Sequence, residues 1–181
     1  MKMALSFAAA VVASMLSASH AAKFTLSSPT VTDGHTLPDI HVYNGFGCTG
    51  GNRSPELSWS GAPAGTKSFA VTVHDPDAPH EGGWWHWIVF DIPASAGGLP
   101  EGVGNGAGLP AGAVESLTDF GKPGYGGACP PPGKPHRYIF AVHALKAAKL
   151  GFGASASPAA VDAAIAQKSL GKATLTALYG R

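Results

Sequence analysis

The sequence predicts a mostly β fold, an antiparallel β-sandwich with one or two short helices near the C-terminus. Several apolar runs rich in β-branched and aromatic residues stop at turns that contain proline. Only one segment has a convincing helical pattern, and strands do not alternate with helices along the chain. A doubly wound parallel fold is therefore disfavoured.

Turn and cap residues delimit the predicted elements. The strongest strand candidates are residues 69–74, 84–92 and 137–145, and shorter ones are residues 24–26, 55–59 and 173–179. The helix candidate begins with Ser157 as its N-cap and Pro158 at its first position, and Gly171 is expected to close it.

The first 21 residues have the pattern of a secretory signal peptide. Lys2 precedes a short apolar run at residues 4–16, and Ser19 and Ala21 are small residues at the cleavage positions. The run is shorter than the roughly 20 apolar residues that span a membrane. We therefore expect residues 22–181 to form one exported domain, periplasmic or secreted, without stable membrane insertion.

Charge limits the kinds of partner. The whole chain has 12 Lys+Arg and 11 Asp+Glu, and loss of Lys2 with the signal leaves the domain formally neutral. Nucleic-acid binding and polybasic membrane contact both need a positive field, so neither is expected. Recognition of an anion would have to come from a local pocket.

Cys48 and Cys129 are the two cysteines of the chain, and both lie in loops rich in Gly and Pro. In an oxidising compartment, an even number of cysteines favours a disulfide. Two buried, unpaired thiols are the alternative, because the sequence does not show whether the two Cα atoms lie close enough to be bridged.

The two-residue period of strands places polar groups at one end of three apolar stripes. The stripes are Phe69, Val71, Val73 and Asp75; Trp84, His86, Ile88 and Phe90; and His136, Tyr138, Phe140 and Val142. Each polar end lies beside a proline-rich loop. This placement predicts a pocket at one end of the sandwich, where a few polar groups meet apolar walls.

Two motifs resemble the signatures of a known family. The first is Asp75-Pro76-Asp77-Ala78-Pro79 followed by Trp85-His86-Trp87, and the second is the run PPPGKPHRY at residues 130–138. In combination and spacing, they resemble the signatures of the phosphatidylethanolamine-binding (Raf-kinase-inhibitor-like) family. Residues 47–55 and 119–127 are similar to segments of its bacterial branch.

The resemblance implies an antiparallel β-sandwich whose small pocket accepts phosphate-like anions, including the phosphoethanolamine head group. The positions that match the family's pocket are Asp75, His86, His136 and Tyr138, and those that match its walls are Pro79, Trp84, Trp85, Pro130 and Pro131. Asp77 and Arg137 match a pair that is structural in the family and joins the two signatures.

The chemistry of these residues suits a phosphate, because imidazole N–H groups and a tyrosine hydroxyl can donate to it. We expect His86 and His136 to bind as imidazoliums, so that binding strengthens as the pH falls toward 6. Asp75 is expected to orient His86 and not to contact the anion, because like charges repel.

Catalysis and metal binding are weaker interpretations. The tripeptide Asp119-Phe120-Gly121 lacks the accompanying kinase motifs and is interpreted as a turn, and no Gly-x-Ser-x-Gly nucleophile motif is present. The His and Asp residues between positions 74 and 86 lack a compact metal-ligand spacing. We expect no enzyme activity, no metal and no cofactor.

Three function classes follow. The leading one is the binding of a small anionic or phosphate-bearing ligand. The second is a protein-interaction role, such as inhibition of a protease or modulation of a kinase or other partner. The third, a hydrolase, is the least favoured because a nucleophile is lacking.

Overall fold

The structure is a computed structural model that describes residues 22–105 and 107–181, and the predicted signal peptide lies outside these residues. The strands are β1 (Thr25–Ser27), β2 (Asn44–Gly45), β3 (Cys48–Thr49), β4 (Leu57–Ser60), β5 (Ser68–Asp75), β6 (Trp84–Pro93), β7 (Gly98–Leu99), β8 (Val114–Glu115), β9 (His136–Leu145) and β10 (Ser169–Tyr179). The helices are a short 3₁₀ turn, η1 (Asp39–His41), and α1 (Pro158–Lys168).

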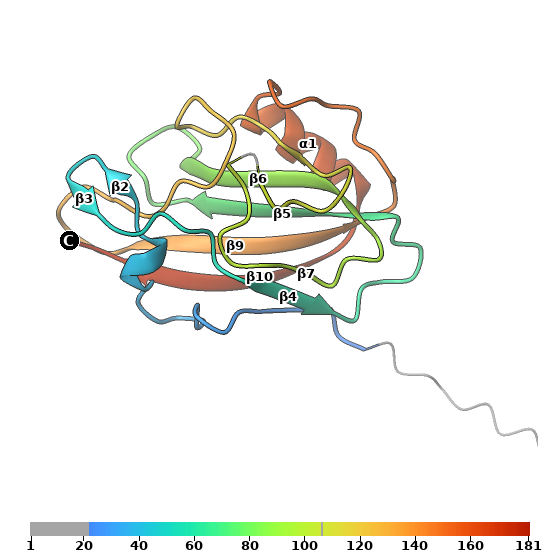
Figure 1. Cartoon of the computed structure of the whole chain (residues 1–181), viewed down its shortest axis with the longest axis horizontal. Coiled ribbons are helices and arrows are strands. Elements are labelled where there is room, and N and C mark those ends of the chain that lie inside the picture. The colour runs from blue at the N-terminus through green and yellow to red at the C-terminus, as the bar shows by residue number, and fades with distance from the viewer. Residues whose placement is uncertain (1–21, 106) are drawn as a thin grey trace, which may run out of the picture.

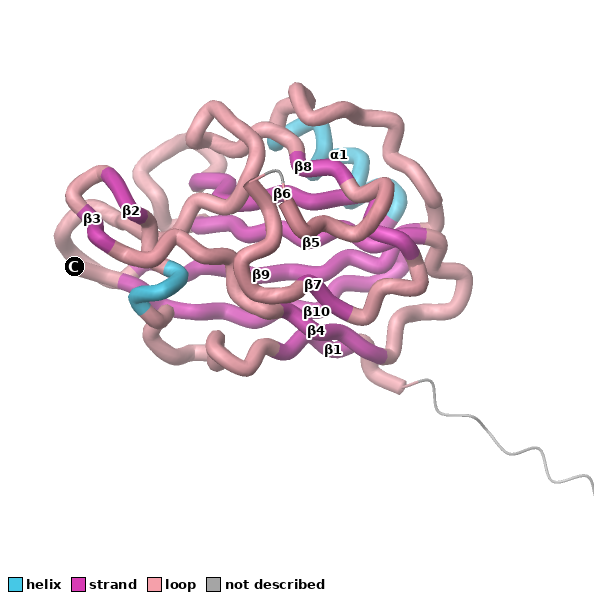
Figure 2. The backbone as a smooth tube through the Cα atoms, viewed as in Figure 1, coloured by secondary structure: helices cyan, strands magenta, loops and turns pink. Residues whose placement is uncertain are grey.

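A five-stranded antiparallel sheet in the order β10-β9-β5-β6-β8 forms the centre of the molecule. Its four long strands run side by side across the view in Figure 1. A small sheet, β1-β4-β7, overlaps the lower long strands in that view, and β2 and β3 form a hairpin at one end (Figure 2). The predicted fold class, mostly β and antiparallel with a helix near the C-terminus, is confirmed.

Both faces of the central sheet are buried, each against a different partner. On one face, side chains of the long strands pack with Leu26, Leu57 and Trp59 of the small sheet. On the other face, a second cluster of β-strand residues packs against Val161 and Ile165 of α1. The sandwich is therefore completed partly by strands and partly by loops on one side, and by a helix on the other.

The predicted alternation holds on β5 and β9 but is wrong on β6. Val73 pairs with Trp87 and His74 pairs with Trp85, so His86 is an extra residue that bulges from β6. After the bulge, Trp87 and Val89 face the small sheet, whereas Ile88 and Phe90 face α1. Trp84, His86, Ile88 and Phe90 therefore do not share one face.

Helix α1 begins as predicted but ends earlier. Ser157 caps it, and its Oγ accepts a hydrogen bond of 3.4 Å from the backbone N–H of Ala160. Gly171 was expected to close the helix, yet the last helical residue is Lys168 and the chain passes at once into β10. Pairing of Ser169 with Leu145 takes the chain into the sheet, and Gly171 lies at an irregularity in that pairing.

Truncation of a buried helix side chain should measure how much α1 contributes to the core. Ile165 is fully buried, and Ile165→Ala should lower the free energy of unfolding by about 2–5 kcal/mol because it leaves a cavity. Gln167 is exposed on the same helix, so Gln167→Ala should change stability by less than about 0.5 kcal/mol. Urea unfolding of both variants checks this, and equal small effects would show that α1 is not integral to the core.

Candidate ligand-binding site

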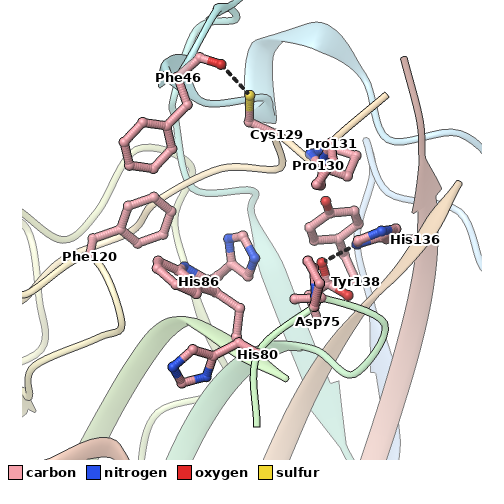
Figure 3. Close-up of a pocket in the computed structure, with 13 residues that line it drawn as sticks. Phe46, Asp75, His80, His86, Phe120, Cys129, Pro130, Pro131, His136 and Tyr138 are labelled. Atoms are coloured by element: carbon pink, nitrogen blue, oxygen red, sulfur yellow. Dashed lines mark hydrogen bonds and ion pairs between the residues drawn. The ribbon is translucent and has the colours of Figure 1, made fainter. Parts of the chain in front are cut away.

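Three strand ends meet at one end of the central sheet, where β5 ends and the neighbouring β6 and β9 begin. A pocket of about 240 Å³ lies there (Figure 3). Its lining residues are Phe46, Asp75, Ala78, Pro79, His80, Trp84, His86, Phe120, Cys129, Pro130, Pro131, His136 and Tyr138. Polar groups gather on one side and aromatic rings on the other.

All the residues predicted for the pocket and its walls line this pocket, with one exception. Trp85 does not, because the bulge turns its side chain to the opposite face of the sheet, where it packs beside the α1 cluster. There its ring lies 4.2 Å from the ring of His74, measured between centroids. The assignment of Trp85 to the pocket wall is therefore wrong, and the binding role of the other residues remains a prediction.

Asp75 and His136 form a close pair on the polar side of the pocket. The Nδ1 atom of His136 lies 2.7 Å from one carboxylate oxygen of Asp75, and the backbone N–H of Asp77 donates to the other at 2.8 Å. The Asp75 side chain is only 4% exposed. The carboxylate thus orients His136, with which it hydrogen-bonds, and not His86 as the sequence led us to expect.

His86 is fixed by the loop that follows β8. Its Nδ1 atom lies 2.7 Å from the carbonyl oxygen of Gly126, and the backbone N–H of Gly126 donates to the His86 carbonyl at 2.9 Å. The next residue is held in turn, because the Gly127 N–H donates to Asn52 Oδ1 at 2.8 Å. The ring orientation of His86 is therefore set by the backbone.

Burial keeps His86 neutral. It lowers the pKa of His86 to about 4, against the opposing influence of the Gly126 and Gly127 backbone and of the Asp75 charge. The expectation of an imidazolium at His86 near pH 6 is therefore wrong. Desolvation outweighs the carboxylate because Asp75 hydrogen-bonds to His136 and not to His86.

Tyr138 completes the polar side from β9. Burial, and after it the negative charge of Asp75, raises the pKa of Tyr138 well above its usual value. The hydroxyl is therefore protonated at any physiological pH. The ring of Tyr138 packs edge-on against that of His86, with centroids 5.1 Å apart.

Aromatic rings form the opposite wall, and two of them were not predicted. Phe120 lies 5.5 Å from both Trp84 and His86 and stacks on Phe46 at 6.0 Å, measured between ring centroids. Phe46 is 67% exposed and sits at the tip of the β2–β3 hairpin. Nothing in the local sequence signals either ring, because both reach the pocket through contacts distant in the chain.

The predicted disulfide between Cys48 and Cys129 is present and holds one wall of the pocket. The two Cα atoms are 6.0 Å apart across a sequence separation of 81 residues. Cys129 leads directly into Pro130 and Pro131, while Cys48 belongs to the hairpin that carries Phe46. The bond therefore joins the proline wall to the aromatic wall.

Asp77 and Arg137 form the expected structural pair outside the pocket. The Arg137 guanidinium donates to both carboxylate oxygens of Asp77, at 2.9 and 2.7 Å, and its backbone N–H donates at 2.9 Å. The hydrogen bonds from Arg137 lower the pKa of Asp77 to about 2. The pair links the turn after β5 to the start of β9.

Within residues 22–105 and 107–181, no set of three or more His, Cys, Asp or Glu residues is arranged to hold a metal ion. Of the histidines near the turn, His74 hydrogen-bonds to the Gly82 carbonyl at 2.8 Å and lies on the far face with Trp85. None of the helices in the described chain is long and apolar enough to cross a membrane.

An antiparallel β fold with a half-polar, half-aromatic pocket at the end of its sheet is the architecture of a ligand-binding protein. The chain belongs to the phosphatidylethanolamine-binding protein family, whose model matches residues 27–180. It is similar to the UPF0098 proteins YbcL and YbhB of Escherichia coli K12. YbcL is 48% identical over 93% of this chain and 94% of its own length, and YbhB is 49% identical over 85% and 98%.

Solved and curated relatives extend this likeness. The crystal structure of E. coli YbcL, described as a new member of the mammalian PEBP family, has a TM-score of 0.87 and 49% identity over 88% of this chain and 99% of that one. A protein of Mycobacterium tuberculosis, the putative lipoprotein LppC, is 38% identical over 86% of this chain and 71% of its own length.

Removal of the disulfide should weaken the fold. Replacement of Cys48 and Cys129 by serine should lower the free energy of unfolding by roughly 4 kcal/mol. Without the bond, the unfolded chain is no longer constrained by a long closed loop and gains conformational entropy. Denaturant unfolding of the variant, and of the wild type with and without reductant, measures this. Ser155→Ala, at an exposed position distant from the bond, is the control. Equal stability of the oxidised and reduced protein would contradict the prediction.

The buried histidines should make the fold sensitive to mild acid. Burial lowers the pKa of both His86 and His143 to about 4 from 6.5, so between these values the unfolded chain binds more protons than the folded one. Stability should therefore fall as the pH decreases from 6.5 toward 4, by about 1 kcal/mol per pH unit for each histidine.

His86→Asn retains a donor for the Gly126 carbonyl but lacks the titrating ring, so it should reduce this slope by about 1 kcal/mol per pH unit. Urea unfolding at several pH values between 6.5 and 4.5 measures it. A slope as steep in the variant as in the wild type would show that His86 is not the group that resists protonation.

Proposed function

We propose that this chain is an exported binding protein whose pocket takes small, phosphate-bearing anions such as phosphoethanolamine. Membership of the family supports a binding role. The observation that carries the finer proposal is the arrangement of His136, Tyr138 and His86 around one small pocket, with Asp75 behind His136. A phosphate needs several polar partners at fixed positions, and this side of the pocket supplies them.

His136 is the main candidate for direct contact with the anion. Its Nδ1 is occupied by Asp75, so its other ring nitrogen, Nε2, is the one left for a ligand.

Export is supported by three observations. The signal-like pattern of residues 1–21 remains a prediction from sequence. The Cys48–Cys129 disulfide suits an oxidising compartment such as the periplasm or the exterior. A relative that is called a putative lipoprotein agrees with placement outside the cytoplasm.

The same proposal holds that the protein is not an enzyme. Both cysteines of the chain are joined in the disulfide, which leaves neither as a thiol nucleophile. The Asp75–His136 pair could activate a water molecule, but no serine or threonine lines the pocket to form a covalent intermediate. Binding without turnover is the simpler use of this arrangement.

A protein-interaction role is the second candidate, and one observation favours it. Phe46 is 67% exposed at the mouth of the pocket, next to Phe120 and Tyr43. An exposed aromatic ring on a hairpin tip is a common anchor for a protein partner. The phosphate titration described below separates the two candidates, because only the first requires a small anion to bind.

Phosphate and phosphoethanolamine should bind to the wild-type protein, and the double variant His86→Ala/His136→Ala should abolish binding. His35→Ala is the control, because His35 is exposed on a turn outside the pocket. Isothermal titration at pH 6 measures the affinities. Equal affinity in the wild type and the double variant would contradict the proposal.

Asp75→Asn should weaken phosphate binding about tenfold without unfolding the protein, because His136 loses a charged hydrogen-bond partner. The effect should be nearly absent in a His136→Ala background, since Asp75 acts through that ring. If Asp75→Asn instead tightens binding, its charge merely repels the anion. Assays of the wild-type protein for hydrolysis of phosphate esters and peptides test the proposal that it is not an enzyme, and neither activity is expected.

A further inference from the structure

The hydrogen bond between His86 and Gly126 determines which nitrogen of His86 carries the proton. A carbonyl oxygen only accepts hydrogen bonds, so Nδ1, 2.7 Å from the Gly126 oxygen, must be the protonated nitrogen. Nε2 has no hydrogen-bond partner among the described residues, and the ring lines the pocket. In the neutral ring, Nε2 is therefore a hydrogen-bond acceptor, not a donor.

The other polar groups differ in what they can offer a ligand. Asp75 is a carboxylate already engaged by His136 and by the Asp77 backbone, whereas the Tyr138 hydroxyl can donate or accept. The Tyr138 hydroxyl and the outer ring nitrogen of His136 are the other polar groups that a ligand can meet. The residues that line the pocket include no lysine and no arginine.

The charges around His86 act on its protonation in opposite directions. Asp75 on β5 pulls toward protonation, and His74 on the same strand opposes it. From β9 the ring faces Tyr138 and His136, from the turn after β5 it faces His80, and from the loop after β8 it meets the apolar ring of Phe120. Burial outweighs these influences and keeps the ring neutral above about pH 4.

We propose that the pocket selects ligands that donate a hydrogen bond to Nε2 of His86. Such ligands are singly protonated phosphomonoesters, which should bind in preference to dianions and phosphodiesters. This inference rests on the proposed phosphate-binding function. A monoester monoanion has one P–OH to donate to Nε2 and anionic oxygens that can accept from the Tyr138 hydroxyl. A dianion lacks the donor and adds charge beside Asp75, and a phosphodiester has no P–OH at all.

The inference distinguishes two sources of the same head group. In a membrane lipid, the phosphoethanolamine phosphate is a diester, whereas in the free head group it is a monoester. The pocket should therefore prefer the free compound to the head group of an intact lipid. Because the second pKa of a phosphomonoester is about 6, its binding should weaken above that pH.

Calorimetric titration of the protein with its disulfide intact, between pH 5 and 8, tests this with three probes. The probes are phosphoethanolamine, its methyl diester and 2-aminoethylphosphonate, whose second pKa is higher than that of the ester. At pH 6 the diester should bind about tenfold more weakly or worse, because it leaves Nε2 without a partner. The midpoint of the pH profile should move upward for the phosphonate, by the difference between the two ligand pKa values.

The outcomes separate this inference from the function on which it rests. Equal affinity for monoester and diester, or one midpoint shared by both monoanions, would overturn it and leave phosphate binding intact. Failure of all three probes to bind would overturn both.

Variants at two histidines refine the test. His86→Gln can present an amide N–H where Nε2 lies, so it should accept the diester about as well as the monoester and lose the ligand-dependent midpoint. His35→Gln, at an exposed turn outside the pocket, should retain both preferences. If circular dichroism shows that His86→Gln is unfolded, the three-probe comparison on the wild type decides alone.

Discussion

One extra residue in β6 determines how this site is built. His86 bulges out of the pairing with β5, and its carbonyl and ring both bond to Gly126 of a distant loop. That double attachment brings the loop of residues 116–128 onto the end of the sheet, and with it Phe120, Cys129 and the prolines. Without the bulge, strict alternation would direct His86 and Trp87 to opposite faces, and the pocket would lose either its histidine or its supporting core.

The sequence predicts the polar side of the pocket well because its residues are fixed by local rules. Asp75 follows a strand that ends at prolines, and Tyr138 continues the regular alternation of β9, so both positions follow from the strand period. Trp85 is misplaced for the same reason, since a period of two cannot reveal a bulge. The partner of Asp75 is missed as well, because two histidines stand near it in the sequence pattern and only the fold shows which one it contacts.

The aromatic side of the pocket cannot be predicted from such local rules. Phe46 and Phe120 are far apart in sequence and stack only because the disulfide and the Gly126 attachment bring their loops together. The protonation state of His86 is equally inaccessible from sequence, since it depends on how completely the ring is buried. The part of the site that long-range contacts create therefore cannot be predicted from local sequence patterns.

The hairpin tip carries a conflict between backbone and side chain. Phe46 and Gly47 form a two-residue turn with φ of 53° and 84°, a conformation that glycine or asparagine adopts easily and a bulky residue does not. Replacement of Phe46 by glycine would relax the turn, yet it would also open the aromatic wall beside Phe120. At position 46, glycine would therefore make the fold more resistant to heat, whereas phenylalanine closes the pocket better.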